Sequence, residues 1–153
     1  MIFVTVGTHN QGFERLVQKM DEIACEIDEE VVMQIGFTEY KPENAKWFKF
    51  VDIGEIMNFY KNADVIVTHA GAGALLDALS FEKPIIAVPR LKKFGEHIDD
   101  QQLELTEALE NKGQIKAVYE IDDLEGFIGE NRVKHEIKKS KELLNFLNYY
   151  LNS

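Results

Sequence analysis

The stretch of residues 64–90 constrains the fold of this chain most strongly. Its β-branched run Val65-Ile66-Val67 is typical of a buried parallel strand. Gly71 and Gly73 follow, and glycines at that spacing let the backbone turn sharply and approach a ligand closely. Helix-forming residues come next, and Ile85 to Val88 form a second predicted strand. Strand, glycine turn, helix and strand in this order predict a parallel α/β sheet.

The same alternation of strand and helix patterns continues along the chain. Further strands are expected over residues 2–6, 31–35, 46–51 and 115–119. Helices are expected from about residue 12, over 53–61, from residue 74, and over 98–111, 122–128 and 131–152. We therefore predict a single Rossmann-like domain over residues 1–130, with a mostly parallel sheet. The amphipathic C-terminal helix, within 131–153, either belongs to the same domain or docks on a partner.

Composition and charge exclude several classes of function. A formal net charge of −10 over 153 residues argues against a nucleic-acid partner, because duplex binding needs a basic face. The single cysteine, Cys25, rules out an internal disulfide, and its helical setting predicts a buried thiol rather than a nucleophile. No stretch reaches the ~18 consecutive apolar residues of a membrane span. We expect a cytoplasmic protein that reaches a membrane only through a partner.

Two glycine turns, residues 7–12 and 68–73, each follow a predicted strand and precede a predicted helix. In a parallel sheet both turns lie at the carboxyl edge, where such folds bind ligands. Two helix N-termini at one crevice suit a diphosphate, because their N–H groups are free and their dipoles are positive. Alternatively, the glycines only permit tight packing between strand and helix. A dinucleotide-binding fingerprint fits badly, since the third glycine is missing and Arg90-Leu91 replaces the acidic residue expected for a ribose.

Four segments together are similar to one known family. Thr68 to Leu79, Lys83 to Arg90 and Glu96 to Leu103, with the opening Phe3 to Thr8, resemble the C-terminal domain of family 28 glycosyltransferases. The similarity extends over roughly residues 1–118. It is strongest to stand-alone catalytic subunits, those of the dolichol-pathway N-acetylglucosaminyltransferase and of PssE-type exopolysaccharide glycosyltransferases. The resemblance implies the donor-binding half of a GT-B enzyme, which takes a UDP-sugar and needs neither a metal ion nor another cofactor.

The resemblance also implies which residues hold the donor. Gly71 and Gly73 would admit the diphosphate to the helix that begins at Ala74, and the His69 imidazole would donate to a phosphate oxygen. Asp77 would accept hydrogen bonds from the ribose hydroxyls. The remaining positions are Gly7, Thr8 and Gly12 for a second phosphate turn, Phe50 and Val51 for the uracil, and Gln101 and Gln102 for the sugar.

Plainer interpretations stand beside several of these roles. His69 is alternatively a hydrogen-bonded histidine at a strand end, Phe50 a core residue, and the glutamine pair a solvated helix start. Two positions depart from the family pattern, because Ala74 replaces a hydroxyl side chain and Asp77 is shorter than the usual glutamate.

A dense group of cations lies near the same predicted edge. Arg90, Lys92 and Lys93 either counter the charge of the donor, steer an anionic acceptor, or face water as part of a loop. The net charge of −10 makes such local cations valuable to an anionic ligand.

The catalytic base is not identified by the sequence. In fused relatives it comes from the acceptor domain, and His9, at the crevice edge, is the candidate that this chain offers. A group of potential metal ligands follows further on, although the family needs no metal and none is expected: Glu96, His97, Asp99 and Asp100.

The resemblance implies a catalytic, donor-binding subunit of an inverting glycosyltransferase. It would move a sugar from a UDP-sugar to a lipid-linked (polyprenyl diphosphate) saccharide acceptor, in polysaccharide or glycan biosynthesis. A GT-B active site is a cleft between two domains, so a membrane-anchored, acceptor-binding subunit is the expected partner. The alternative is a non-catalytic sugar-nucleotide-binding or assembly subunit, which the departures at Ala74 and Asp77 favour.

Overall fold

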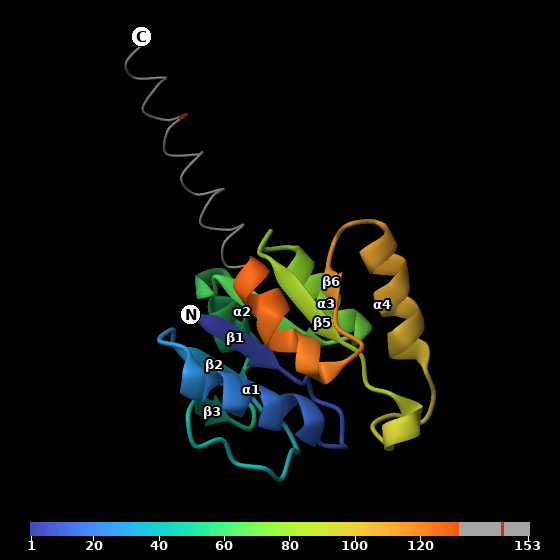
Figure 1. Ribbon diagram of the computed structural model, residues 1–153, viewed down its shortest axis with the longest axis horizontal. Helices are drawn as coiled ribbons and strands as arrows, with labels where there is room; N and C mark the ends of the chain where they lie inside the picture. The colour runs from blue at the N-terminus through green and yellow to red at the C-terminus, as the bar shows by residue number, and fades with distance from the viewer. Residues whose placement is uncertain (132–144, 146–153) are drawn as a thin grey trace.

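A six-stranded parallel sheet forms the centre of the molecule (Figure 1). The structure is a computed structural model, and it describes residues 1–131 and residue 145. The strand order is β3-β2-β1-β4-β5-β6, and each adjacent pair is parallel. This confirms the predicted Rossmann-like α/β fold. The order reverses between β1 and β4, which pair directly from Ile2 with Val65 to Thr5 with Thr68.

The described elements alternate as the sequence predicts. The strands are β1 (Ile2–Thr5), β2 (Val31–Gln34), β3 (Lys46–Phe48), β4 (Val65–His69), β5 (Ile85–Val88) and β6 (Lys116–Ala117). The helices are α1 (Glu14–Glu26), α2 (Ile53–Asn62), α3 (Ala72–Leu79) and α4 (Gln101–Asn111), with 3₁₀ turns η1 (Lys92–Phe94) and η2 (Ile121–Asp123). Residues 124–131 are also helical.

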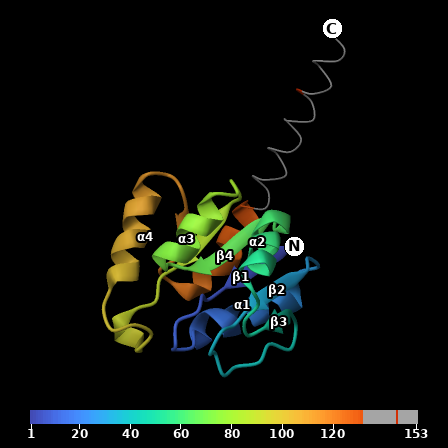
Figure 2. The same ribbon diagram turned by 180° about the vertical axis from the view of Figure 1, so that it is seen from behind.

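The core lies on both faces of the sheet, because successive strand side chains point to opposite sides. Ile2 and Val4 of β1 pack into one cluster, whereas Phe3 between them packs into the other. On the first face lie α1 and residues 124–131 (Figure 1). The second face carries α2, α3 and α4 (Figure 2). Burial on both sides explains why the strands are near-continuous apolar runs.

Several element boundaries differ from the expectations. Helix α3 begins at Ala72, with Gly71 as its N-cap, so Gly73 lies inside the first turn rather than before the helix. Helix α4 begins at Gln101 instead of Ile98, because Asp99 Oδ1 accepts the Gln101 N–H at 3.0 Å and fixes the preceding residues as a turn. β3 and β6 are shorter than predicted, at three and two residues.

Cys25 is exposed, so the prediction of a buried thiol was wrong. The apolar face of α1 is made by Leu16, Met20 and Ile23, which follow one another at helical spacing. Cys25 is nine residues beyond Leu16, which at about 100° per residue places it on the opposite, solvated side of the helix.

Two further predictions concern membranes and the C-terminus. None of the helices within the described part of the chain has the length and apolarity needed to cross a bilayer. The predicted amphipathic helix over 131–153 lies outside the described residues, apart from Asn131 and Asn145.

Candidate functional site

A cleft of about 660 Å³ opens at the carboxyl ends of β1, β2 and β4. This is the edge at which the strand order reverses, the usual ligand position in an open α/β sheet. Residues from the two glycine turns, from α2, from the start of α3 and from α4 meet there. They are Thr5, Gly7, Thr8, His9, Gln34, Val51, Ile53, Ile56, Tyr60, His69, Gly71, Gly73, Ala74, Asp77 and Gln102.

The His69 imidazole lies between the two glycine turns. It ends β4, and a β-carbon added at either Gly7 or Gly71 would overlap the ring itself. Gly7 also has a φ of +72°, which side-chain-bearing residues rarely adopt. Glycine at these two positions therefore makes room for the histidine. Gly73 differs, because a β-carbon there would meet no atom within 4 Å.

His69 is a buried polar side chain without a partner. Its exposed fraction is 7%, and neither ring nitrogen has a hydrogen-bond partner among the described residues. Burial, with smaller contributions from Arg90, His9 and His97, lowers its pKa to about 3. The ring is therefore neutral near pH 7, and it carries one N–H donor and one acceptor at the wall of the cleft. Buried polar groups normally have partners, so this one is well suited to a ligand.

The N-terminus of α3 faces the same space without a protein cap. Its N-cap residue Gly71 makes no side-chain hydrogen bond, and the first turn holds no acidic residue. By contrast, the Asp52 carboxylate caps α2 by accepting the Glu55 N–H at 2.9 Å. The free N–H groups and the positive dipole end of α3 are therefore available to an anion.

Sequence reasoning missed the polar floor of the cleft. Thr5 and Gln34 are paired residues at the ends of β1 and β2, and the Thr5 hydroxyl donates to Gln34 Oε1 at 2.6 Å. The same hydroxyl accepts the Gly7 N–H at 3.1 Å, which fixes the start of the turn. The amide NH₂ of Gln34 is left to donate to a ligand. Each is the single polar residue within an apolar run, residues 2–6 and 31–35, a signal that the sequence contained.

One side of the cleft is apolar. Val51, Ile53 and Ile56 line it around the start of α2. Phe50, predicted with Val51 to hold a uracil, does not line the cleft: it is 42% exposed, and its ring meets that of Phe37 edge-on at 5.1 Å. Val51 is thus the member of that pair that the structure brings to the cleft.

Asp77 lies on the cleft wall within the electrostatic reach of Tyr60. Burial, together with the nearby Asp77 carboxylate, raises the pKa of the Tyr60 hydroxyl to about 12. A protonated phenol and a carboxylate therefore lie on the same wall, one offering a donor and the other acceptors.

The glutamine pair is divided between two environments. Gln102 is buried and lines the cleft, and its Oε1 accepts the Arg90 backbone N–H at 3.1 Å. Its amide NH₂ is the part left for a ligand. Gln101 is exposed and lines an adjoining pocket instead.

Gly12 does not line the cleft, unlike the other glycines of the predicted set. A β-carbon there would lie 2.8 Å from Thr38 Cα, so the residue permits close backbone packing. Its carbonyl accepts a hydrogen bond from Arg90 at 2.9 Å. At Gly12 the structure therefore agrees with the alternative prediction, in which the glycine only permits tight packing.

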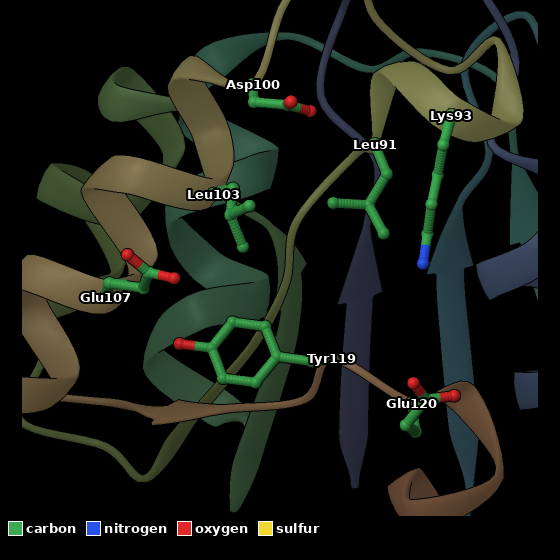
Figure 3. Close-up of a pocket in the computed structure, with 7 residues that line it drawn as sticks. All are labelled: Leu91, Lys93, Asp100, Leu103, Glu107, Tyr119 and Glu120. Carbon is green, nitrogen blue, oxygen red and sulfur yellow. The ribbon is translucent and has the colours of Figure 1, made fainter.

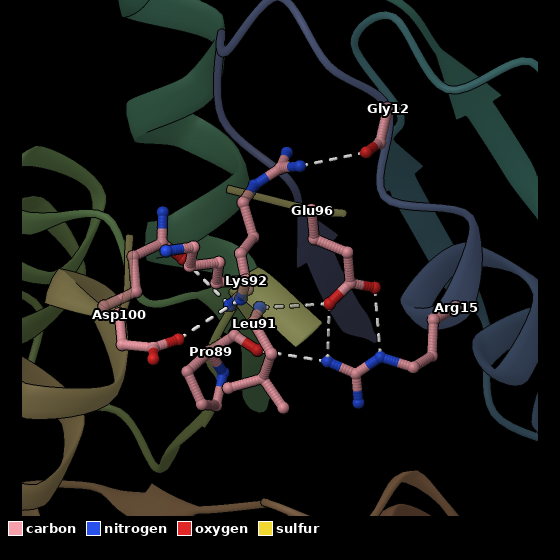
Figure 4. Close-up of polar contacts among 9 residues, drawn as sticks. Gly12, Arg15, Pro89, Leu91, Lys92, Glu96 and Asp100 are labelled. Carbon is pink, nitrogen blue, oxygen red and sulfur yellow. Dashed lines mark hydrogen bonds and ion pairs between the residues drawn. The ribbon is translucent and has the colours of Figure 1, made fainter. Parts of the chain in front are cut away.

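Arg90 is fully buried, so it does not form a solvated cluster with Lys92 and Lys93, which are exposed. Its guanidinium donates to the Gly12 carbonyl at 2.9 Å (Figure 4). It also donates to the Val6 carbonyl at 3.1 Å and lies over the Phe13 ring. Burial, partly offset by Glu96, lowers its pKa to about 10, which leaves it charged at neutral pH.

Arg15 of α1 forms a second link between the same two regions. It donates two hydrogen bonds to the Glu96 carboxylate, at 2.9 and 3.0 Å, and one to the Pro89 carbonyl at 3.1 Å (Figure 4). Glu96 also accepts the Leu91 N–H at 3.1 Å. The β1–α1 turn and the loop after β5 are therefore held together by two arginines.

Another pocket, of about 330 Å³, lies between α4 and the residues that follow β6 (Figure 3). Leu91, Leu103 and the Tyr119 ring form its apolar part. Three carboxylates and one lysine surround it: Asp100, Glu107, Glu120 and Lys93. It shares no lining residue with the cleft, and its excess of carboxylates makes it unsuitable for a diphosphate.

The fold is that of one half of a GT-B glycosyltransferase. A solved structure described as the glycotransferase of kitacinnamycin matches 86% of this chain with a TM-score of 0.66 at 20% identity, and the match covers 34% of that structure. Residues 1–144 match the family model of the glycosyltransferase family 28 C-terminal domain. The chain belongs to this family, and the resemblance found in the sequence is confirmed.

Curated relatives lie in the same family. UDP-N-acetylglucosamine transferase subunit ALG13 of Candida albicans is 27% identical over 117 residues, which are 76% of this chain and 37% of the relative. A second relative is the UDP-N-acetylglucosamine--N-acetylmuramyl-(pentapeptide) pyrophosphoryl-undecaprenol N-acetylglucosamine transferase of Prochlorococcus marinus. It is 26% identical over 166 aligned positions, which cover 93% of this chain and 44% of the relative. This chain thus spans less than half the length of either protein.

Proposed function

We propose that this chain is the catalytic, UDP-sugar-binding subunit of an inverting glycosyltransferase that acts on a lipid-linked saccharide acceptor. The observation that carries the proposal is the unpartnered His69 imidazole beside the uncapped N-terminus of α3. Together they offer several N–H donors to one point of the cleft, as a metal-free diphosphate site requires. The names of the relatives, both transferases of N-acetylglucosamine and one with a lipid diphosphate acceptor, support this reading.

The cleft offers a place for each part of the donor. The apolar side formed by Val51, Ile53 and Ile56 suits a uracil, and Asp77 supplies acceptors for the ribose hydroxyls. The diphosphate would lie at His69 and the start of α3, and the sugar near the Gln102 amide. In the reaction an acceptor hydroxyl attacks the anomeric carbon and gives its proton to a general base, while the bond from that carbon to the diphosphate oxygen breaks and UDP leaves with the electron pair. The N–H groups at the diphosphate stabilise the charge that develops on the leaving group.

The proposed partner is a membrane-anchored subunit that binds the acceptor and supplies the second wall of the active site. Apolar side chains around the carboxyl edge support this part of the proposal. Phe37, Phe94 and Ile98 follow the ends of β2 and β5 and are 55%, 53% and 81% exposed. Apolar groups gathered at one edge are typical of a surface that another protein covers. Through this partner the chain would be cytoplasmic and peripheral to the membrane.

A transfer assay tests the proposal. The chain, co-purified with its membrane partner, is incubated with membranes and radiolabelled UDP-sugars, and label in the lipid fraction is counted. We expect transfer from one donor, and transfer should be lost with His69→Leu. The second candidate, a non-catalytic sugar-nucleotide-binding subunit, is favoured by the absence of a hydroxyl at Ala74. Binding of UDP-sugar without transfer from any donor would establish that candidate instead.

A further inference from the structure

Arg90 carries a positive charge that no carboxylate in the described part of the chain neutralises by contact. Its side chain is fully buried, and none of the ion pairs within residues 1–131 includes it. Burial lowers the pKa of Arg90, and Glu96 partly offsets this. The Glu96 carboxylate, however, already accepts two hydrogen bonds from Arg15 and one from the Leu91 N–H. Arg15 and Glu96 thus form a neutral pair, and the charge of Arg90 is left uncompensated.

The Arg90 guanidinium also keeps unused hydrogen-bonding capacity. Two of its nitrogens donate to the Val6 and Gly12 carbonyls, whereas the third, Nε, is buried without a partner. A buried charge is costly unless ion pairs and hydrogen bonds compensate it, and two backbone carbonyls do so only in part. Ionisable groups held in such unfavourable surroundings are typical of functional sites, where a ligand of opposite charge completes the compensation.

The buried guanidinium lies close behind the cleft. Its carbonyl partners Val6 and Gly12 flank the β1–α1 turn, and residues 7–9 of that turn line the cleft. The Arg90 backbone N–H donates at 3.1 Å to Oε1 of Gln102, which is another lining residue. Arg90 itself does not line the cleft, so its charge would act on a ligand across these residues.

The charge of Arg90 reaches two histidines of the cleft. Burial is the largest cause of the lowered pKa of both His9 and His69, and the charge of Arg90 is the second. A cation that disfavours a proton on these imidazoles favours an anion in the same place. Because the whole chain has a formal charge of −10, an anionic ligand depends on such local positive potential.

We propose that Arg90 supplies a permanent positive charge to the donor site, acting on the diphosphate across the β1–α1 turn without touching it. The inference rests on the proposed function and makes Arg90 a positioning residue that also favours charged ligands. His69 and the N-terminus of α3 would contact the diphosphate, and Arg90 would add the full charge that these neutral donors lack. Both phosphates of a UDP-sugar are anionic, whereas uridine is neutral. Removing the charge should therefore weaken a UDP-sugar and leave uridine nearly unaffected.

Arg90→Gln removes the charge and keeps a side chain that can donate to one of the two carbonyls. Calorimetry measures the affinities for a UDP-sugar and for uridine. Their ratio is the readout, because a merely structural defect of the turn lowers both affinities. We expect the ratio to fall about tenfold, as for the loss of one charge acting across a few atoms of protein. Lys92→Gln, which removes an exposed charge from η1, is the control and should change the ratio by less than about twofold.

The pKa of His9 reports the charge at position 90 in the free protein. It should be higher in Arg90→Gln than in the unaltered chain, as NMR titration of the ring would show, because the nearby cation is gone. Arg90→Lys keeps the charge only as far as the buried amine stays protonated, and its His9 pKa measures how far that is. Across the three proteins the ratio of affinities should fall as the His9 pKa rises. A constant ratio despite a raised His9 pKa would overturn the inference and leave the proposed function standing.

A second control disturbs the same loop without changing its net charge. Arg15→Gln/Glu96→Gln replaces the neutral pair with two amides, so it should leave the ratio of affinities unchanged. A fall of the ratio as large as that in Arg90→Gln would point to a structural cause and overturn the inference.

If Arg90→Gln does not fold, salt decides the question in the unaltered chain. The Debye length shortens from ~10 Å at about 0.1 M salt to ~3 Å at about 1 M, and this screens exposed charges far more than buried ones. With Arg90 as the source, the ratio of affinities should change less than about threefold over this range. A ratio that collapses in salt would assign the preference to surface lysines and overturn the inference. A complete lack of UDP-sugar binding by the unaltered chain would overturn the proposed function as well.

Discussion

His69 and Arg90 are buried ionisable residues at the ends of two adjacent strands, and each has a buried nitrogen without a partner, but they differ in charge and in their other contacts. Arg90 is charged, and its guanidinium donates to the Val6 and Gly12 carbonyls. His69 is neutral, and neither of its ring nitrogens has a partner in the described residues. Burial alone therefore does not mark a binding residue. We assign the histidine, with both ring nitrogens unpartnered, to the proposed site, and the arginine, whose two terminal nitrogens donate to backbone although its Nε has no partner, to the scaffold.

Removing the scaffold cation should have the largest effect. Arg90→Met deletes two hydrogen bonds from a charged group and leaves a buried and a partly buried carbonyl without these donors, so we expect the free energy of unfolding to fall by on the order of 3 kcal/mol. Denaturant unfolding measures the loss. Lys92→Met, an exposed neighbour, is the control and should change stability by less than about 0.5 kcal/mol. An unfolding free energy equal to that of the control would show that Arg90 does not hold the turn.

The next largest loss of stability is expected when the space around the His69 imidazole is filled. In Gly71→Ala the new methyl group overlaps the His69 ring, and overpacking of this kind costs about 1–3 kcal/mol. The double variant Gly71→Ala/His69→Ala should recover most of that stability without recovering donor affinity. Gly73→Ala is the control, because no atom lies within 4 Å of its added β-carbon. Equal stability of Gly71→Ala and Gly73→Ala would contradict the position of the ring.

Substitution of His69, unlike that of Arg90, should reduce ligand affinity without reducing stability. His69→Leu replaces an unpartnered imidazole with an apolar group, so stability should stay equal or rise by up to about 1 kcal/mol. The same change removes the proposed hydrogen bond to the diphosphate, and UDP affinity should fall by about 1–3 kcal/mol. Thermal unfolding and calorimetry on the same preparation measure the two effects. A joint loss of stability and affinity would place His69 in the scaffold with Arg90.

Substitution of Asp77 should cause a smaller loss of affinity, which should differ between nucleotides with and without a 2′-hydroxyl. If its carboxylate accepts from the ribose, Asp77→Asn should weaken uridine diphosphate by about 1 kcal/mol. It should weaken 2′-deoxyuridine diphosphate less, because that ligand already lacks one hydroxyl. The pKa of Tyr60, which burial and Asp77 raise to about 12, should also fall, as ultraviolet titration of the phenol would show. Equal losses for the two nucleotides would mean that Asp77 does not contact the 2′-hydroxyl.

The smallest effect is expected at Cys25. The side chain is exposed on α1, so Cys25→Ser should change the free energy of unfolding by less than about 0.5 kcal/mol. A thiol reagent should label it in the folded protein at the rate of a small model thiol. Slow labelling would indicate that another surface covers this face of α1.

The order of elements was predictable because strands buried on both faces leave β-branched runs in the sequence, as at Val65 and Ile85. His69, Gly71 and Asp77 were found through the resemblance, and the cleft brings them together. The contacts of Arg90 could not be predicted, because they join residues that are far apart in the sequence. Arg90 meets Gly12 and Val6 across 78 and 84 residues, and no local pattern records such pairs.

Other errors arose at element ends. Helix α3 begins two residues earlier than predicted, because Gly73 fits within the first helical turn and does not interrupt it. The sequence does not mark Thr5 and Gln34 as site residues, because each is a single polar residue within an apolar run, and only the strand pairing places them side by side on the floor of the cleft. The side on which Cys25 lies depends on the exact helical phase, which a short apolar pattern determines poorly.

The two bonds from the Arg90 guanidinium close the β1–α1 turn at both ends, at Val6 and at Gly12. Residues 8–11 form the interior of the turn. The two hydrogen bonds that fix its ends, at Val6 and Gly12, can form whatever the length of this interior. Lengthening such a loop costs little, about 0.6 kcal/mol for each doubling. Additional residues between Thr8 and Gln11 should thus be accommodated without disturbing the sheet. Because Thr8 and His9 line the cleft, such insertions should alter ligand binding while leaving the sheet intact.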